Sequence, residues 1–438
     1  MSGLAIGLLG IVAFFILLIF RMPIGFAMAI TGFVGFAYLN SPASALKVLS
    51  SEIFSNFTNY TLSEIPLFIL MGFAAYHAGL GSKLYSFAYK LIGHFPGGLA
   101  IATQPTCAIF GAVCGSNTAT AATIGSISIP EMKKYNYDIS LATGSVAAGG
   151  SLGTLIPPSV NFIIYGIATQ TSIGALFLAG IVPGILLTLL NMIAVYYLTQ
   201  KNPALGPPGP KASWKERFDA AKDGGLWEVF LIFILSLGGL FLGWFTPTES
   251  GAVGAFGVIV LTLLRKLLNW EGLKKALSDT TKTTAMIMLL LAGAIIFGRF
   301  MAISRLPFEL GSLVAKVSLP PFLVMVLILF IYFILGLFMD ALAMVLLTIP
   351  IFYPIAVNTL GYDPIWFGAI IVLALSMGCI TPPVGINVYV IKGVVPDVPL
   401  ETIFRGIWPF FWALTVCLLL LVAFPQIVTF LPNLIMKI

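Results

Sequence analysis

Two stretches of strongly apolar sequence are each interrupted by glycine-rich and proline-rich breaks. The first reads GAVCGSNTATAATIGSISIP at 111–130 and is followed by GGSLGTLIPPSVN at 149–161. The second reads GLFMDALAMVLLTIP at 336–350 and is followed by SMGCITPPVGIN at 376–387. Unpaired backbone groups are too costly to leave in lipid, so non-helical chain at membrane depth persists only where protein covers it or where it lines a cavity. The sequence therefore predicts such internal breaks in both halves of the chain.

The composition places the chain in a membrane. Of the 438 residues, 59% are hydrophobic and only 9% are charged, whereas soluble domains carry about 25% charged residues. Several apolar runs approach the length needed to span about 30 Å of hydrocarbon. They cover 4–20, 229–244, 322–338 and 409–427. We expect an all-α polytopic membrane protein with about ten full spans and two re-entrant hairpins. Its positive net charge fits lipid contact and orientation better than binding of nucleic acid.

Prolines mark corresponding places in two halves of the chain, about 225 residues apart. The matched pairs are Pro23 with Pro247, Pro130 with Pro350, and Pro157-Pro158 with Pro382-Pro383. Such repetition predicts two structural repeats, 1–200 and 226–438, joined by a Pro/Gly-rich and charged linker at 201–225. Each repeat should hold an interfacial arm helix, a re-entrant hairpin and a proline-broken helix. In that order, we expect them at 42–64, 97–130 and 139–169, and again at 265–283, 320–350 and 364–394.

The two arms carry opposite charge. In 42–64, one basic residue stands against two acidic residues, whereas 265–282 holds five basic and two acidic residues. Cytoplasmic segments are rich in Lys and Arg, so the second arm and the linker should be cytoplasmic and the first arm periplasmic. Equivalent segments on opposite faces imply inverted-topology repeats, and both termini then lie in the periplasm. Arg299, Arg305 and Lys316 near the outer side weaken this orientation without reversing it.

The breaks are suited to hold a coupling cation. At the first hairpin tip, 115–118 reads GSNT. Glycine permits close backbone approach, and helix ends leave carbonyl groups free beside the side-chain oxygens. A cage of neutral oxygens suits Na⁺ and avoids burying an unpaired charge, and the two double prolines should free further carbonyls. The expected Na⁺ ligands are Ser116, Asn117, Ser151, Gly153, Pro157, Gly336, Gly378, Thr381 and Val384. The alternative reading of an isolated GSNT is tight helix packing through small residues.

Two breaks in matching halves also predict a solute site between them, as in secondary transporters. Asp340 at the second tip is a candidate ligand for Na⁺, a proton or substrate, with helix capping as the alternative. Arg299 is a candidate partner for an anionic substrate, because its guanidinium can pair with two carboxylate or sulfonate oxygens. The alternative is that its side chain extends to the outer membrane interface. The expected substrate-binding residues are Asn117, Thr118, Arg299, Asp340 and Asn387. His77 and His94 have no carboxylate cluster nearby in sequence, so we expect both to be packing or interfacial residues.

Four motifs together resemble the large membrane subunit of TRAP transporters, the tripartite ATP-independent periplasmic carriers. They are GSNTATAATIGSISIP, GTLIPPS, FTPTESGAVGA and TPPVGINVYV, and the resemblance extends over nearly the whole chain. It implies an elevator-type transporter of the bacterial inner membrane that imports a small organic anion with Na⁺ and needs no other cofactor. It also implies two partners, a small four-helix membrane subunit and a periplasmic substrate-binding protein. The chain departs from the wider superfamily at 338–341, where FMDA replaces a second Ser-Asn-Thr tip.

Other classes of protein fit less well or are harder to separate. A stand-alone carrier of the same superfamily, driven by Na⁺ or H⁺, would show the same breaks. An enzyme is not supported, because the sequence has no HExxH motif and suggests no facing Asp pair or pairing of nucleophile and base. Two inverted halves with gated hairpins fit an alternating-access transporter better than a channel.

Overall fold

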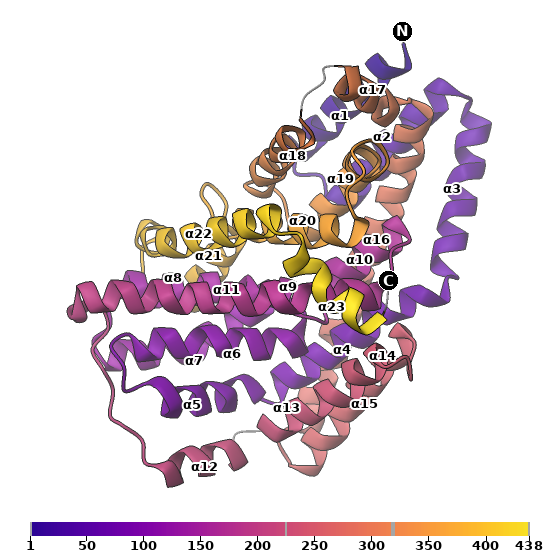
Figure 1. Cartoon of the computed structure of the whole chain (residues 1–438). Coiled ribbons are helices and arrows are strands. Elements are labelled where there is room, and N and C mark those ends of the chain that lie inside the picture. Colours follow the sequence, from indigo (N-terminus) through magenta and orange to yellow (C-terminus); the bar gives the residue numbers. More distant parts are fainter. Residues whose placement is uncertain (1, 224–225, 317–319, 437–438) are drawn as a thin grey trace.

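The computed structural model describes residues 2–223, 226–316 and 320–436, and every regular element in them is a helix. Five of these helices form what we call the scaffold. They are α1 (Gly3–Ile19), α2 (Ile24–Leu39), α4 (Glu64–His77), α15 (Pro247–Leu264) and α16 (Trp270–Ile303). Glycine allows the closest contacts between them, since a Cβ atom on Gly32 of α2 would lie 2.6 Å from the backbone nitrogen of Phe297 in α16. Figure 1 shows α2 and α16 running side by side.

Two helical hairpins carry the glycine-rich and aspartate-containing tips. The first consists of α6 (Gly98–Cys114) and α7 (Asn117–Lys134), and the second of α18 (Pro321–Gly336) and α19 (Ala341–Tyr353). Gly115 ends α6 at a φ of +64°, a left-handed conformation that glycine adopts without strain. Each second helix then begins at a capping side chain. Ser116 accepts a hydrogen bond from the Ala119 nitrogen at 3.4 Å, and Asp340 accepts one from the Leu342 nitrogen at 3.1 Å.

Each double proline interrupts a helix, because proline has no N–H to donate and clashes with the preceding turn. The first interruption separates α8 (Ile139–Gly150) and α9 (Leu152–Leu155) from α10 (Val160–Thr169), and the second separates α20 (Pro364–Gly378) from α21 (Ile386–Val394). We call the hairpins, these broken helices and three flanking helices the block. The flanking helices are α5 (Leu80–Ile92), α11 (Ile173–Lys201) and α22 (Leu400–Ala423). Figure 1 shows α6, α7, α8, α11 and α22 as nearly parallel neighbours.

The linker after α11 follows the surface of the block. Backbone hydrogen bonds join Gly97 N to Gly206 O at 2.8 Å and Asp138 N to Leu205 O at 2.9 Å. The described part of the linker ends in α12 (Trp214–Asp223), and 224–225 of the expected linker lie outside the described residues. The remaining helices are α13 (Leu226–Phe233), α14 (Gly239–Phe241), α17 (Leu306–Lys316) and α23 (Gln426–Met436).

The two expected arms take different forms. The first is a separate helix, α3 (Pro42–Phe57), which begins behind the capping residue Ser41 and lies on the outside of the scaffold (Figure 1). The segment expected as a second arm, 265–283, is not a separate helix. Most of it forms the start of α16, which runs unbroken for 34 residues. The reason is visible in the sequence, because 273–292 contains neither glycine nor proline and so offers nothing to end the helix.

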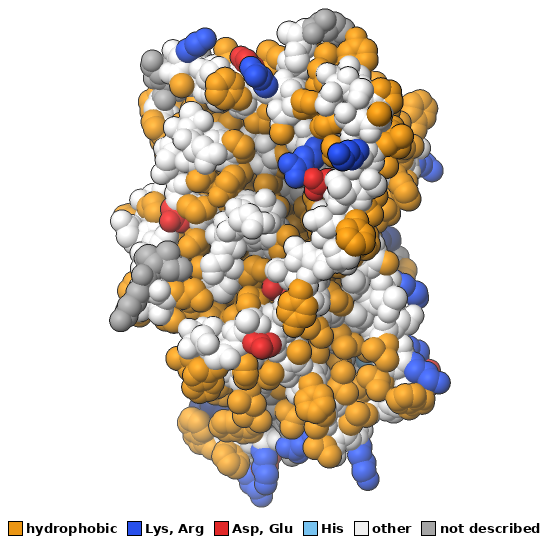
Figure 2. Space-filling model, turned by 90° about the vertical axis from the view of Figure 1, so that its right-hand side faces the viewer, with side chains coloured by type: hydrophobic (Ala, Val, Ile, Leu, Met, Phe, Trp, Pro, Cys, Tyr) orange, Lys and Arg blue, Asp and Glu red, His pale blue; other side chains and the backbone are white. Residues whose placement is uncertain are grey.

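The outside of the molecule is that of a multi-pass membrane protein. Figure 2 shows hydrophobic side chains over much of one face, with Lys and Arg gathered at its lower end. By length and composition, six helices of the described chain can cross a membrane, or up to seven if the bent pair of 60–77 and 80–92 counts as one span. This number is below the ten that we expected. Apolar helices such as α1 and α2, with 17 and 16 residues, fall short of the roughly 20 residues that a full span needs.

Candidate functional site

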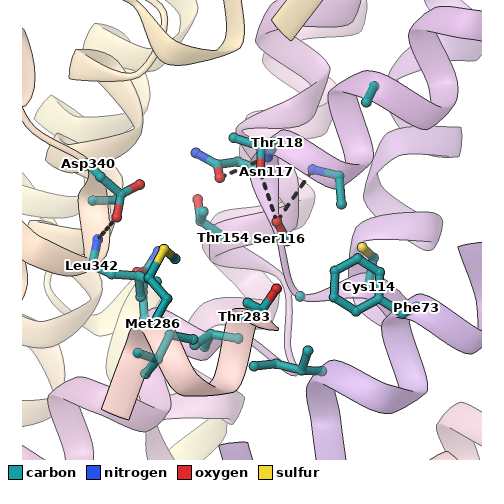
Figure 3. A pocket seen from close by; sticks show the side chains of 18 of the residues that line it. Phe73, Cys114, Ser116, Asn117, Thr118, Thr154, Thr283, Met286, Asp340 and Leu342 are labelled. Atoms are coloured by element: carbon teal, nitrogen blue, oxygen red, sulfur yellow. Dashed lines mark hydrogen bonds between the residues drawn. The ribbon is translucent and has the colours of Figure 1, made fainter. Parts of the chain in front are cut away.

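One cavity of about 450 Å³ lies where the two hairpin tips meet the scaffold. It is lined by both tips, by both broken helices, and by one face each of α4 and α16. The scaffold contributes Ile69, Phe73, Tyr76, Thr283, Met286 and Ile287, and the polar side chains of the block are Ser116, Asn117, Thr118, Thr154, Asn161 and Asp340. Figure 3 shows Asp340 and the tip at 116–118 approaching the cavity from opposite sides. Four of the site residues predicted from the sequence line this cavity: Ser116, Asn117, Thr118 and Asp340.

The first tip is held in shape by short-range hydrogen bonds. The Asn117 side-chain oxygen accepts from the Thr118 nitrogen at 2.9 Å, and the Ser116 and Thr118 hydroxyls lie 3.2 Å apart (Figure 3). The Asn117 side-chain nitrogen donates to Cys379 Sγ at 3.3 Å. Asn117 therefore connects the first tip to the second break, although the two residues are 262 positions apart.

Asp340 combines the two roles that the sequence left open. Its Oδ2 accepts from the Leu342 nitrogen at 3.1 Å and so caps α19, while the same side chain lines the cavity. Among the described residues that line this cavity, Asp340 is the only one with a charged side chain. The described residues contain no cluster of three or more His, Cys, Asp or Glu that could hold a metal ion, so any cation here must rely mainly on neutral oxygens.

The first break lies against the first tip. A Cβ atom on Gly153 would lie 2.8 Å from the carbonyl oxygen of Ser116, so only glycine lets the two backbones come this close. Beside it, the hydroxyl of Ser151 is buried without a hydrogen-bond partner, and so is the side-chain oxygen of Asn161. Pro157 is buried in the break and does not line the cavity. Buried oxygens without a donor are the groups that a bound cation would satisfy.

The second break repeats this arrangement. A Cβ atom on Gly378 would lie 2.6 Å from the Cα atom of Gly336 at the end of α18. The Thr381 hydroxyl donates to the Met377 carbonyl at 2.6 Å. Asn387 is fully buried; its side-chain nitrogen donates to the Ala147 carbonyl at 3.0 Å, and its side-chain oxygen has no partner. The cavity is not lined by any of the residues predicted at this break, which are Gly336, Gly378, Thr381, Val384 and Asn387.

Arg299 is not at the cavity. Its Nη2 lies 2.7 Å from Glu52 Oε1 of the arm helix α3, and its side chain is 58% exposed. Arg299 follows the cavity-lining Ile287 by twelve residues on the same helix, which is roughly 18 Å along the axis. The structure thus pairs Arg299 with the arm, and its suggested contact with substrate is not supported by this arrangement.

His77 is also placed differently from our expectation. Its Nε2 lies 2.9 Å from Asp279 Oδ2, so it does have a carboxylate partner, 202 residues away in the sequence. The pair connects the end of α4 to α16, one residue after Tyr76 and four residues before Thr283, both of which line the cavity. Sequence proximity could not reveal this contact because the two helices meet only in the fold.

Several lining residues were not predicted from the sequence. Thr154 and Asn161 lie within the quoted break, and their position beside the double proline was the available signal. Thr154 also connects the two halves, since its hydroxyl lies 2.9 Å from that of Ser376. The scaffold residues carry a weaker signal: Phe73 and Tyr76 are three positions apart, so they share one face of α4, but nothing in the sequence says what that face meets.

The fold and the cavity define a class. An all-helical, multi-pass membrane protein with hairpin tips and interrupted helices gathered around a cavity of apolar and polar side chains is a membrane transport protein. The fold is similar to a solved structure: the YdaH transporter of Alcanivorax borkumensis matches with a TM-score of 0.60 over 88% of this chain and 90% of that one, at 16% identity. At this level of identity, the match supports the fold alone.

The family follows from sequence. The model of the tripartite ATP-independent periplasmic transporter DctM component matches residues 11–427. The chain is 37% identical over 398 residues to the C4-dicarboxylate TRAP transporter large permease protein DctM of Pseudomonas aeruginosa, covering 90% of this chain and 91% of that protein. It is 34% identical over 420 residues to the sialic acid TRAP transporter large permease protein SiaM of Vibrio cholerae, covering 95% and 96%. The chain belongs to the DctM family of TRAP transporters, and it is a large permease component, not an enzyme.

Proposed function

We propose that this permease imports a small organic anion, a carboxylate or sulfonate, together with Na⁺ across the bacterial inner membrane. The solute is delivered by a periplasmic binding protein, and a small four-helix membrane subunit completes the complex. The observation that carries this proposal is the cavity lined by both tips, by residues of both broken helices and by the scaffold helices α4 and α16. A solute held there would contact both hairpin tips and the scaffold.

The coupling ion is assigned from the oxygens around the breaks. Three buried side-chain oxygens without partners belong to Ser151, Asn161 and Asn387, and free helix-end carbonyls add to them. The proposed first Na⁺ site uses Ser116, Asn117, Ser151, Gly153 and Pro157, and the second uses Gly336, Gly378, Thr381 and Val384. Neutral oxygens suit Na⁺, because they ligate the cation without burying several unpaired charges.

The proposed solute is bound without a basic side chain, because no Lys or Arg of the described chain lines the cavity. The N-termini of α7, α10 and α19 open onto it, and helix N-termini favour anions through their free N–H groups. The hydroxyl of Thr118 and the amide of Asn117 supply further donors. Na⁺ beside Asp340 would offset the repulsion between this carboxylate and an anionic solute, which makes ion binding a condition for solute binding.

The proposed movement is that of an elevator, in which the block slides against the scaffold. Inverted repeats, which are part of this proposal, would supply the two equivalent gates that alternating access needs. The glycine contacts recur in the two halves: Gly111 meets Gly153 as Gly336 meets Gly378, with both members shifted by about 225 positions. In the proposed orientation, α3 is periplasmic, the linker is cytoplasmic and both termini are periplasmic.

The stand-alone carrier is the less favoured reading, because the matching family is described as one component of a tripartite system. Proteoliposomes containing this chain, alone or with both partners, test the difference directly. We expect uptake of the solute to require both partners and an inward Na⁺ gradient. Equal uptake when K⁺ replaces Na⁺ would refute Na⁺ coupling, and full uptake by this chain alone would favour the stand-alone carrier.

A pair of variants tests whether the proposed ion site lies at the first tip. Asn117→Leu removes an oxygen at the first tip and should lower Na⁺-dependent uptake by at least about tenfold, which corresponds to 1.4 kcal/mol. Asn358→Leu makes the same chemical change at an exposed position and should leave uptake unchanged. Membrane insertion of both variants, measured by their yield in the membrane fraction, should match that of the wild type. Unaltered Na⁺ dependence in Asn117→Leu would count against this placement of the site.

A further inference from the structure

A second cavity lies outside the transport site, between the start of α12 and the turn that follows α5. Its volume is about 560 Å³, and its walls include His94, Lys211, Trp214, Glu216 and Arg217. The substrate cavity lies elsewhere, because the two cavities have no lining residue in common. Nothing in the transport mechanism above uses this site.

The backbone around this cavity is fixed. Gly209 N donates to Gly93 O at 2.8 Å, directly beside His94, and Gly97 N donates to Gly206 O at 2.8 Å. These bonds dock the proline-rich part of the linker onto the block before α12 begins. The cavity is therefore formed by two segments that hold each other in place, and its walls do not depend on a free loop.

The cavity contains hydrogen-bond donors that lack acceptors. Arg217 lies over the Trp214 ring, 5.1 Å from its centroid, and its Nε and Nη2 are buried without a hydrogen-bond partner. His94 Nδ1 is buried and unpartnered as well, and its tautomer decides whether it donates or accepts. Buried donors of this kind cost free energy unless an acceptor satisfies them. The missing partner is therefore rich in acceptor oxygens.

The single carboxylate of the cavity does not serve as that partner. Glu216 Oε2 accepts from the Ser213 nitrogen at 2.7 Å and from its hydroxyl at 2.9 Å, the reciprocal arrangement that caps a helix. These bonds hold the pKa of Glu216 below its ordinary value. With Glu216 engaged in capping, the charges of Lys211 and Arg217 remain available to an anion from outside.

The surface beside the cavity identifies the source of the anion. Trp214 and Phe218 are 82% and 70% exposed, and their spacing of four places them on the same face of α12. On the same helix, Lys215 and Lys222 are exposed as well. A helix with aromatic residues on one face and Lys and Arg around it lies in the headgroup region of a bilayer. A dissolved phosphate would need the basic cavity but not the exposed aromatic pair.

We propose that this cavity binds the phosphate group of an anionic phospholipid, with Trp214 and Phe218 seated at the boundary between headgroups and acyl chains. Lys211 and Arg217 supply the positive charge that attracts the phosphate, and His94 lines the same cavity. The lipid thereby holds α12, a ten-residue helix of the linker, against the membrane surface.

The test uses the purified full-length chain and native mass spectrometry with added phosphatidylglycerol or phosphatidylcholine. We expect phosphatidylglycerol to bind preferentially. Each basic side chain near a lipid phosphate contributes about fivefold in affinity, which corresponds to about 1 kcal/mol. Lys211→Gln combined with Arg217→Gln should therefore weaken phosphatidylglycerol binding by about 25-fold. Lys215→Gln combined with Lys222→Gln removes the same charge from the same helix outside the cavity and should weaken binding less than the cavity pair does.

Three results would overturn the proposal. The first is unchanged lipid binding in the Lys211→Gln and Arg217→Gln variant, or an equal loss in its matched control. The second is tight binding of inorganic phosphate alone, together with no weakening of lipid binding by Trp214→Ser and Phe218→Ser, because this pattern describes a site for a dissolved anion. The third is protection of 211–222 from hydrogen exchange that depends on a co-purified polypeptide and not on added phosphatidylglycerol. Melting curves of all variants control for folding.

Discussion

At the scale of single residues, Asp340 has the most demanding position. It ends the break between α18 and α19, where the chain needs a cap, and it places a carboxylate in a cavity that holds no basic side chain among the described residues. A cap needs only an acceptor oxygen, which Asn supplies as well as Asp. Charge in the cavity requires the carboxylate itself. The two roles can therefore be separated by substitution.

Asp340→Asn should keep the stability of the protein and lose its transport. The amide oxygen still accepts from the Leu342 nitrogen, so thermal unfolding should stay close to that of the wild type. Solute uptake should fall by at least about tenfold, since hydrogen bonds and contacts to a charged group contribute about 1.5–3 kcal/mol. Asp340→Ala should lose transport and also about 1 kcal/mol of stability, because the cap is removed. Wild-type uptake by Asp340→Asn would reduce this residue to a cap.

Contacts between residues that lie far apart in the sequence could not be predicted. Asn117, Thr118 and Asp340 could be placed at the cavity because glycine and the helix breaks mark the tips. Arg299 could not, because its partner Glu52 lies 247 residues away in an arm whose position the sequence does not give. A charged side chain at the end of an apolar run looks the same whether it meets a solute or a carboxylate on a neighbouring helix.

At the scale of elements, the contact between α18 and α20 is made through glycine. A Cβ atom on Gly378 would meet three backbone atoms of Gly336 at 2.6–2.7 Å, and backbone cannot rotate away as a side chain can. We expect Gly378→Ala to push the second hairpin from its broken helix, at a cost of about 1–3 kcal/mol, and to impair uptake strongly. Thermal unfolding and uptake in proteoliposomes measure both effects.

Gly393→Ala is the matched control, because nothing lies within 4 Å of a Cβ atom added there in α21. It should be neutral or slightly stabilising, since alanine favours a helix more than glycine does. Equal effects of the two substitutions would mean that the close approach at Gly378 is not needed.

Element boundaries were predictable where the chemistry of one residue decides them. The double prolines place the breaks in α8–α10 and α20–α21, because two consecutive residues without an N–H disrupt a helix more than one does. Single prolines such as Pro105 and Pro183 remain inside α6 and α11. The extent of α16 was not predictable from charge. The basic segment at its start suggested a separate arm, but a change from polar to apolar side chains does not interrupt backbone hydrogen bonds. The charge of a segment indicates whether it lies in water or in lipid, but it does not indicate where its helix begins or ends.

At the scale of the whole molecule, the elevator proposal requires that the block moves against the scaffold while each remains intact. Contacts within the scaffold should then persist through the cycle, and contacts between scaffold and block should not. Two pairs of positions test this distinction on α16. A Cβ atom on Gly298 would lie 3.8 Å from the Cβ atom of Pro350 in α19, and a Cβ atom on Gly272 would lie 3.8 Å from that of His77 in α4. Both separations match the spacing found in disulfides.

Cross-linking should therefore have opposite consequences at the two pairs. Oxidation of Gly298→Cys with Pro350→Cys would join scaffold to block, and we expect it to abolish uptake, with recovery on addition of a thiol. Oxidation of Gly272→Cys with His77→Cys would join two scaffold helices, and uptake should persist at the level of the reduced variant. The four native cysteines are buried, which limits competing disulfides. Uptake that survives complete cross-linking of the first pair would mean that α16 and α19 travel together, and the division into scaffold and block would have to be redrawn.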